Sequence, residues 1–319
     1  MAGIDEGAAT ALGASSAGAA DYRGAEDMDE GASDVPVRLR MDLAYDGTHF
    51  HGWAAQPGLR TVEGELTEAL SMVTRIPVSL TVAGRTDAGV HASDQVAHVD
   101  VPRETWDGVG ETLMRRVNGI VARRFREAVG GPGCDVVVRS IQPVDPRFDA
   151  RFSAEGRRYV YRLAPPGAQR PWERTNVTWV RRELDVDAMA GAAGALLGEH
   201  DFLSFCKPRE GATTIRTLTD IGVVSDATGV LEVRVAADAF CHSMVRSIVG
   251  ALIEVGTGRR DAGWLTGLVG NPSREQAAPI APPEGLMLKE VSYGQDAEAW
   301  EARAKASRRR RDEEPCCGG

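Results

Sequence analysis

The sequence predicts an α+β protein with a continuous, mainly antiparallel sheet that carries helices on one face. Segments with the two-residue alternation of strands recur along the chain and are separated in part by segments with helical spacing. Short turns such as Ala227-Thr228-Gly229 join other strands directly, and hairpins make antiparallel neighbours. At 319 residues, 43% of them hydrophobic, the chain can bury a substantial core.

The first half of the expected sheet lies within residues 35–150. At 37–43, apolar residues alternate with charged ones, which indicates a strand with one buried face. Thr61 precedes a helical pattern of apolar residues and is a suitable N-cap. The remaining elements expected here are strands at 78–82, 95–101 and 135–144 and a helix near 111–117.

The second half is expected to repeat this order of elements within residues 151–295, although no sequence repeat is visible. Its expected strands are 157–163, 218–225, 230–236 and 287–292, and its expected helices are 186–197, 242–255 and a short one near Trp264. Residues 1–34 and 296–319 are expected to be disordered tails, the first acidic and poor in large apolar side chains, the second highly charged.

The net charge of -9 at first argues against a nucleic-acid partner, because binding phosphates requires Lys and Arg. However, residues 1–34 hold eight acidic residues and a single basic one, Arg23, so the rest of the chain is nearly neutral. Arginines then cluster at positions 115, 116, 123, 124 and 126 and at 147, 151, 157, 158 and 162. They form either a local basic face or a set of separately solvated surface residues.

No cofactor, metal or membrane is expected. The five cysteines include no C-x-x-C pair and no Cys/His spacing suited to zinc, so neither a structural metal nor a disulfide is predicted. No nucleotide-binding motif occurs. The chain also lacks an apolar run of about eighteen residues and a secretory signal, which predicts a cytoplasmic location.

One connection between two predicted strands concentrates residues suited to chemistry. The segment GRTDAGVHASDQVAHVD at 84–100 combines glycines, an arginine, an aspartate and a histidine. Loops on a rigid scaffold are where catalytic side chains are commonly presented. Taken alone, Asp87 before Ala88-Gly89 fits an ordinary turn, because Asp readily bonds its own backbone there.

Taken together with four other segments, this loop resembles the signature of the tRNA pseudouridine synthase A (TruA) family. The other segments are AYDGTHFHGW at 44–53, FDARFSAEGRRYVY at 148–161, AFCHSMVRSIVGALIEV at 239–255 and PEGLML at 283–288. The resemblance extends over residues 37–294. It departs from the family pattern at Ala54 and Glu63, where the family has glutamine, and at 118–133, which replaces a shorter segment.

The resemblance implies the pseudouridine synthase fold, with two related α/β halves, and a cofactor-free conversion of uridine to pseudouridine. This reaction breaks the N-glycosidic bond, turns the detached uracil and rejoins it through carbon. It requires a carboxylate that either attacks the sugar or base or takes a sugar proton, and the resemblance carries that role to Asp87. It also implies a homodimer that acts on the anticodon arm of tRNA, near tRNA positions 38 to 40.

Four further residues receive roles from the resemblance. Arg246 is expected to form an ion pair with Asp87, and Tyr159 to pack on the target uracil and help remove its C5 proton. Leu286 is expected to form an apolar floor of the pocket. Arg85 is expected to flip the target nucleotide out of its stack and to hold the vacancy with its planar cation.

His91 and the overall activity leave alternatives open. His91, four residues after Asp87, either pairs with Asp87 or fixes the loop by hydrogen bonding. A second function is an RNA-binding or RNA-folding protein without turnover, against which Asp87, Tyr159 and Arg246 argue. A third is a small-molecule hydrolase that uses Asp87 and His91, which predicts activity without RNA and a severe loss for His91→Ala.

Overall fold

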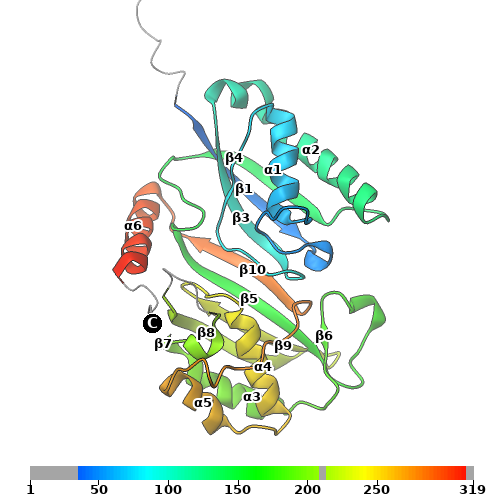
Figure 1. The fold of residues 1–319 in the computed structure, drawn as a ribbon, viewed down its shortest axis with the longest axis vertical. Coiled ribbons are helices and arrows are strands. Elements are labelled where there is room, and N and C mark those ends of the chain that lie inside the picture. Colours follow the sequence, from blue (N-terminus) through cyan, green and yellow to red (C-terminus); the bar gives the residue numbers. More distant parts are fainter. Residues whose placement is uncertain (1–34, 208–212, 314–319) are drawn as a thin grey trace, which may run out of the picture. The chain divides into compact units, whose positions relative to one another are not determined.

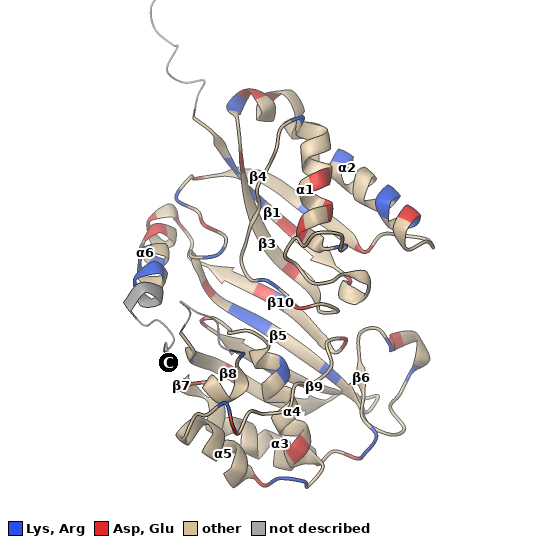
Figure 2. Ribbon diagram, in the orientation of Figure 1, with Lys and Arg blue, Asp and Glu red and all other residues tan. Residues whose placement is uncertain are grey.

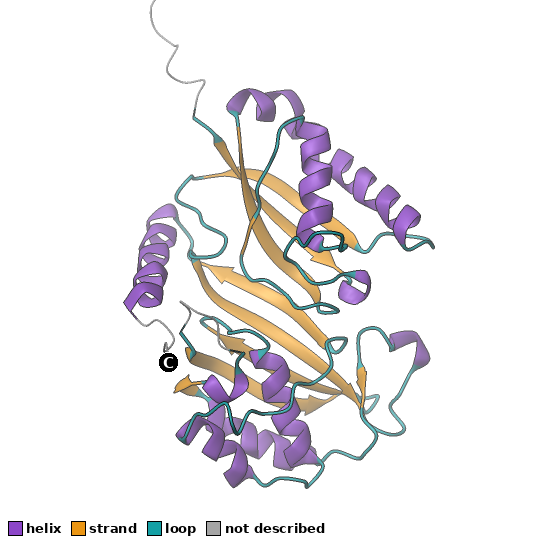
Figure 3. Cartoon of the chain, viewed as in Figure 1, coloured by secondary structure: helices purple, strands orange, loops and turns teal. Residues whose placement is uncertain are grey.

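The computed structural model describes residues 35–207 and 213–313, and the acidic N-terminal segment expected to be a tail lies outside them. These residues form one sheet of ten strands (Figure 3). The strands are β1 (Val37–Tyr45), β2 (Thr81–Val82), β3 (His91–Val101), β4 (Val136–Val144), β5 (Ala154–Ala164), β6 (Thr178–Trp179), β7 (Gly198–Asp201), β8 (Ile215–Ser225), β9 (Leu231–Ala237) and β10 (Leu286–Tyr293).

The strands before and after residue 150 occupy different parts of this sheet. Its main path runs β4-β1-β3-β10-β5-β9-β8-β7, with β2 beside β3 and β6 beside β5 (Figure 1). Most neighbours are antiparallel, but the two parts meet where β10 runs parallel to β3 at the pairs Met287–His91 and Leu288–Ala92. The predicted fold class, a continuous and mainly antiparallel sheet, is therefore confirmed.

Five helices lie on one face of the sheet and bury it. They are α1 (Val62–Thr74), α2 (Arg103–Ala128), α3 (Val186–Ala193), α4 (Met244–Gly256) and α5 (Ala262–Gly270). Directly paired residues point to the same face, and a chain of pairs runs from Tyr45 through Ala92, Leu288 and Tyr159 to Val235. All five side chains are buried. The five central strands thus bury the same face, in keeping with the predicted sheet with helices on one face.

The N-terminal part follows the predicted order with changed lengths. Thr61 caps α1 as expected, accepting a hydrogen bond from Gly64 N–H at 3.2 Å. The second strand is shorter than predicted, and α2 is much longer, because its buried residues continue through Val121 and Phe125. Most of the segment at 118–133 is therefore helix. No helix among the described residues has the length and apolar character needed to cross a bilayer.

The helix α6 (Ala297–Glu313) corrects the expectation of a disordered tail from residue 296. Trp300 lies edge-on to Phe148, with ring centroids 5.2 Å apart, and its Nε1–H donates to the Gly294 carbonyl. Ala304 is buried on the same side of the helix. This burial offsets the entropy of ordering the helix. The buried contacts of α6 are with residues such as Phe148 that lie far away in the sequence, so its highly charged composition does not indicate that it folds.

Candidate active site

The loop between β2 and β3 carries Asp87 and is braced by the segment at 44–53. Trp53 N–H donates to the Thr86 carbonyl at 3.0 Å. Gly52 has a φ of +93°, and a Cβ at this position would lie 2.9 Å from the Thr86 oxygen. Only glycine allows the two backbones to approach this closely in this conformation. The motif at 44–53 thus holds the carboxylate loop in place.

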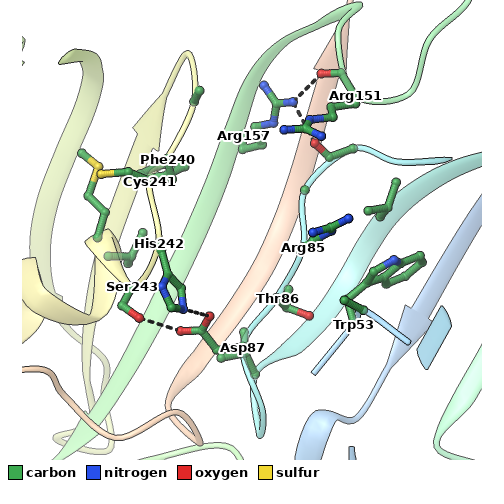
Figure 4. A pocket seen from close by; sticks show the side chains of 18 of the residues that line it. Trp53, Arg85, Thr86, Asp87, Arg151, Arg157, Phe240, Cys241, His242 and Ser243 are labelled. Carbon is green, nitrogen blue, oxygen red and sulfur yellow. Dashed lines mark hydrogen bonds and ion pairs between the residues drawn. The ribbon is translucent and has the colours of Figure 1, made fainter. Parts of the chain in front are cut away.

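The carboxylate of Asp87 contacts three side chains at the start of α4, and two of them, Ser243 and Arg246, donate hydrogen bonds to it. Ser243 Oγ lies 2.9 Å from Oδ2, and His242 Nε2 lies 3.3 Å from Oδ1 (Figure 4). Arg246 Nη1 lies 3.0 Å from Oδ2. Ser243 adopts a φ of 61°, which is uncommon for a residue other than glycine and is often found where function requires strain. This conformation starts α4 so that all three side chains reach Asp87.

Arg246 is held between Asp87 and the loop before β10. Its Nε donates to the Ala281 carbonyl at 2.8 Å, so its Nη1 is directed at Asp87. The side chains of Arg246 and Asp87 are 18% and 23% exposed, so water screens their attraction only in part. The structure therefore brings the expected pair together, and each residue supplies the charge that the other needs.

Tyr159, Leu286 and Arg85 line the same cavity as Asp87. Tyr159 is 7% exposed and lies edge-on to Phe240, with ring centroids 5.1 Å apart. Burial raises the pKa of Tyr159, so its hydroxyl keeps its proton at neutral pH. Leu286, at the start of β10, is buried. Arg85 is exposed and forms no ion pair with any residue of the described segments.

The cavity is cationic although the whole chain carries a net charge of -9. Its volume is about 1060 Å³, larger than a typical small-molecule site. Charged residues of both signs are spread over the described chain (Figure 2). Among the described residues that line the cavity, seven are basic and three acidic: Arg85, Arg151, Arg157, Lys207, Arg216, Arg246 and Arg303, against Glu63, Asp87 and Asp238. Such a cavity favours a polyanion.

His91 forms no hydrogen bond or ion pair with Asp87 among the described residues, and its ring contacts the backbone of other segments instead. It is 3% exposed and is absent from the described lining of the cavity. Its Nδ1 accepts from Gly47 N–H at 3.0 Å, and its Nε2 lies 3.1 Å from the Glu284 carbonyl. Of the two roles considered for His91, the structure supports fixing the loop. His242 occupies the position beside the carboxylate instead.

Three residues of the site were not predicted. His242 and Ser243 stand four and three residues before Arg246, a spacing that places them at one helix start and could have indicated them. Arg157 had no such signal, because its partners are distant carbonyls. Its Nη1 donates to Asp238 O at 2.8 Å, and its Nη2 donates to the carbonyls of residues 83 and 151, both at 2.9 Å. Arg157 therefore ties three cavity loops together.

A disulfide joins Cys206 and Cys241, contrary to the expectation of none. Their Cα atoms are 5.8 Å apart, within the usual range for such a link. The two cysteines are 35 residues apart in the chain, and no short-range spacing indicates their approach. Cys241 precedes His242, so the link fastens the turn that contacts Asp87.

Comparisons with known proteins agree with this fold and site. A family model described as tRNA pseudouridine synthase matches residues 192–294. A tRNA pseudouridine synthase A of Frankia casuarinae is 50% identical over 279 residues, covering 86% of this chain and 96% of the relative. The enzyme of Streptomyces griseus is 49% identical over 265 residues, covering 82% of this chain and 89% of that relative. That of Leifsonia xyli is 50% identical over 282 residues, covering 83% and 95%.

The protein is thus a pseudouridine synthase of tRNA, an isomerase. More closely, the chain belongs to the tRNA pseudouridine synthase A family, as the sequence motifs predicted. A solved archaeal box H/ACA sRNP Nop10-Cbf5 complex aligns with a TM-score of 0.31 and 10% identity, over 82% of this chain and 60% of that chain. That alignment is too distant to add to the assignment.

Removing the His242 side chain is expected to lower kcat rather than tRNA affinity. His242→Ala leaves Arg246 and Ser243 on the Asp87 carboxylate but removes the contact to its other oxygen. We expect kcat for pseudouridine formation to fall about 10-fold, the scale of one close polar contact to a charged group, with KM for tRNA unchanged. His200→Ala, which removes a histidine outside the described cavity lining, is the control. Equal rates for the two variants would contradict a role for His242.

Proposed function

We propose that this tRNA pseudouridine synthase uses Asp87 as its catalytic carboxylate on a uridine of the anticodon arm, near tRNA positions 38 to 40. The observation that supports this most strongly is the position of Asp87 in a cationic cavity, 3.0 Å from Arg246, with Tyr159 and Leu286 on the same lining. An ionised, oriented carboxylate beside an aromatic ring is what the rearrangement of a nucleoside requires.

The proposed roles come from the family resemblance, and the geometry of each side chain is compatible with them. Arg246 and Ser243 donate to the Asp87 carboxylate and His242 lies beside its other oxygen, so it is held in one orientation as it attacks the sugar or base or takes a sugar proton. Tyr159 is proposed to pack on the uracil ring, and such stacking contributes about 1–3 kcal/mol. That is enough to keep the freed uracil in the cavity while it turns. Leu286 excludes water from the same space.

Arg85 is proposed to replace the target base in its stack. It is exposed on the loop that carries Asp87 and has no carboxylate partner in the described part of the chain. Extruding a base costs a few kcal/mol. A planar guanidinium can stack in the vacancy and contact phosphates, which reduces that cost.

The alternatives are less well supported. A hydrolase that uses Asp87 with His91 is disfavoured, because His91 binds Gly47 and Glu284. A binding protein without turnover does not require the three side chains that contact the Asp87 carboxylate. A homodimer in the cytoplasm remains a proposal that rests on the family resemblance, and light scattering of the purified protein would test the dimer.

Sequencing-based mapping of pseudouridine in tRNA tests the substrate. We expect cells without this protein to lose pseudouridine near positions 38 to 40 and to regain it when the wild-type chain is supplied. The Asp87→Asn chain, expressed at the same level, should not restore it. Loss at other tRNA positions would overturn the proposed anticodon-arm substrate while leaving the enzyme class intact.

A further inference from the structure

Helix α6 forms part of the cavity wall although it follows the segment that matches the family model. That match ends at residue 294, and α6 begins at Ala297. Three of its residues, Arg303, Ala306 and Ser307, line the cavity that holds Asp87. We call these three residues the α6 cavity face. The helix therefore contributes to a site whose chemical groups lie on other elements.

The position of α6 is fixed by contacts of residues next to the cavity face on the helix surface. Trp300 packs on Phe148, and Ala304 is buried. Arg308 forms an ion pair with Asp149 at 2.8 Å, and its guanidinium lies 4.9 Å from the centre of the Phe152 ring. The cavity face is therefore presented by an anchored helix.

The charge on this side of the cavity is positive and only partly compensated. Arg303 donates Nε–H to the Ala154 carbonyl at 3.1 Å and forms no ion pair within the described segments. Arg157, whose guanidinium is bound to backbone carbonyls, lines the same cavity. Two guanidinium groups without a carboxylate partner among the described residues favour an anionic ligand that enters from solvent.

We propose that the α6 cavity face binds the phosphate backbone of the substrate tRNA beside the nucleotide that enters the site. Arg303 supplies a charge to a phosphate, and Ser307 can donate its hydroxyl to a phosphate oxygen. Ala306, which is exposed and small, leaves room for the backbone to approach. The cavity is larger than one nucleoside requires, so it can also hold adjoining nucleotides. This inference rests on the enzyme acting on tRNA.

Two substitutions on α6 test the proposal against a matched control. Arg303→Gln removes a cation from the cavity face, and Ala306→Glu adds an anion there without disturbing a buried contact. Lys305→Gln makes the same change of one charge unit, but Lys305 is 71% exposed, lies outside the described lining, and points about 200° around the helix from Arg303. All three variants should keep the wild-type melting temperature within a few degrees.

The measurements are tRNA affinity at several salt concentrations and steady-state pseudouridine formation. We expect Arg303→Gln and Ala306→Glu each to weaken tRNA binding about 5-fold at low salt, and Arg303→Gln to reduce the slope of log Kd against log salt by about one. KM should rise, kcat at saturating tRNA should stay unchanged, and Lys305→Gln should behave as wild type. For Ala306→Glu the weakening should disappear at high salt, whereas a folding defect would persist.

The possible failures are separable. If the wild-type protein converts tRNA but both cavity-face variants bind as Lys305→Gln does, α6 has no part in RNA binding and the proposal is wrong. If wild-type protein forms pseudouridine but not in the anticodon arm, the proposed substrate position fails while the result for α6 still stands. Arg303→Lys should restore most of the salt dependence if charge, and not packing, is what matters.

Discussion

Asp87→Asn is expected to abolish pseudouridine formation while tRNA binding persists. Asparagine has nearly the same shape and can still accept a hydrogen bond from Ser243, but it has neither the charge nor the basicity of the carboxylate. A positioned proton-transferring group contributes up to about 10⁴-fold to a rate, and loss of a covalent nucleophile costs at least as much. We therefore expect single-turnover rates to fall by about 10⁴-fold or more, with Kd for tRNA changed less than about 3-fold.

Asp94→Asn is the control for this substitution. Asp94 stands seven residues further along, is half exposed and pairs with Arg139 at the surface. Surface pairs of this kind contribute little to stability, so this variant should retain wild-type activity. Residual activity of Asp87→Asn above about one hundredth of wild type would mean that another group performs the chemistry.

Arg246→Gln is expected to have the second largest effect. Glutamine cannot bind the Ala281 carbonyl and balance the Asp87 carboxylate at the same time, so a partly buried charge is left without its cation. Removal of one such electrostatic partner typically lowers kcat by about 10²–10³-fold. We expect a loss of that size, together with a lower melting temperature, because the guanidinium also links α4 to the segment before β10.

One further variant separates charge from geometry at position 246, and another serves as a control. Arg246→Lys keeps the charge but not the two-sided guanidinium, and should recover part of the rate. Arg259→Gln removes an arginine that follows α4 and pairs with Glu254 at 3.1 Å with its own side chain 51% exposed; it should leave kcat unchanged. Equal kcat values for Arg246→Gln and Arg259→Gln would contradict the role given to the ion pair.

The order of helices and strands could be predicted because each element has a local sequence pattern of its own. The alternation at 37–43 and the cap at Thr61 reflect burial and hydrogen bonding within a few residues. Element lengths were less predictable, since α2 continues only where Val121 and Phe125 meet the rest of the core. The helix α6 was missed for the same reason: its buried residues have partners near Phe148, far away in the sequence.

The residues of the candidate site could be predicted through family motifs, but residue spacing alone could not show which of them lie together. Asp87 and Arg246 are 159 residues apart, and only the family resemblance joined them before the structure did. Proximity in the chain suggested His91 as a partner, yet the strand that begins at His91 turns its side chain into the core. His242 reaches Asp87 because α4 starts there, a fact of tertiary structure that no spacing near Asp87 contains.

The place of β10 in the sheet has a consequence for biosynthesis. This strand comes last in the chain order, yet it lies between β3 and β5 and is the element that joins the two groups of strands. A nascent chain that has not yet emerged beyond Tyr293 can form local hairpins and helices, but the residues of β3 and β5 that pair with β10 stay unpaired. Assembly of the cavity that holds Asp87 must therefore wait until the chain up to Tyr293 has left the ribosome.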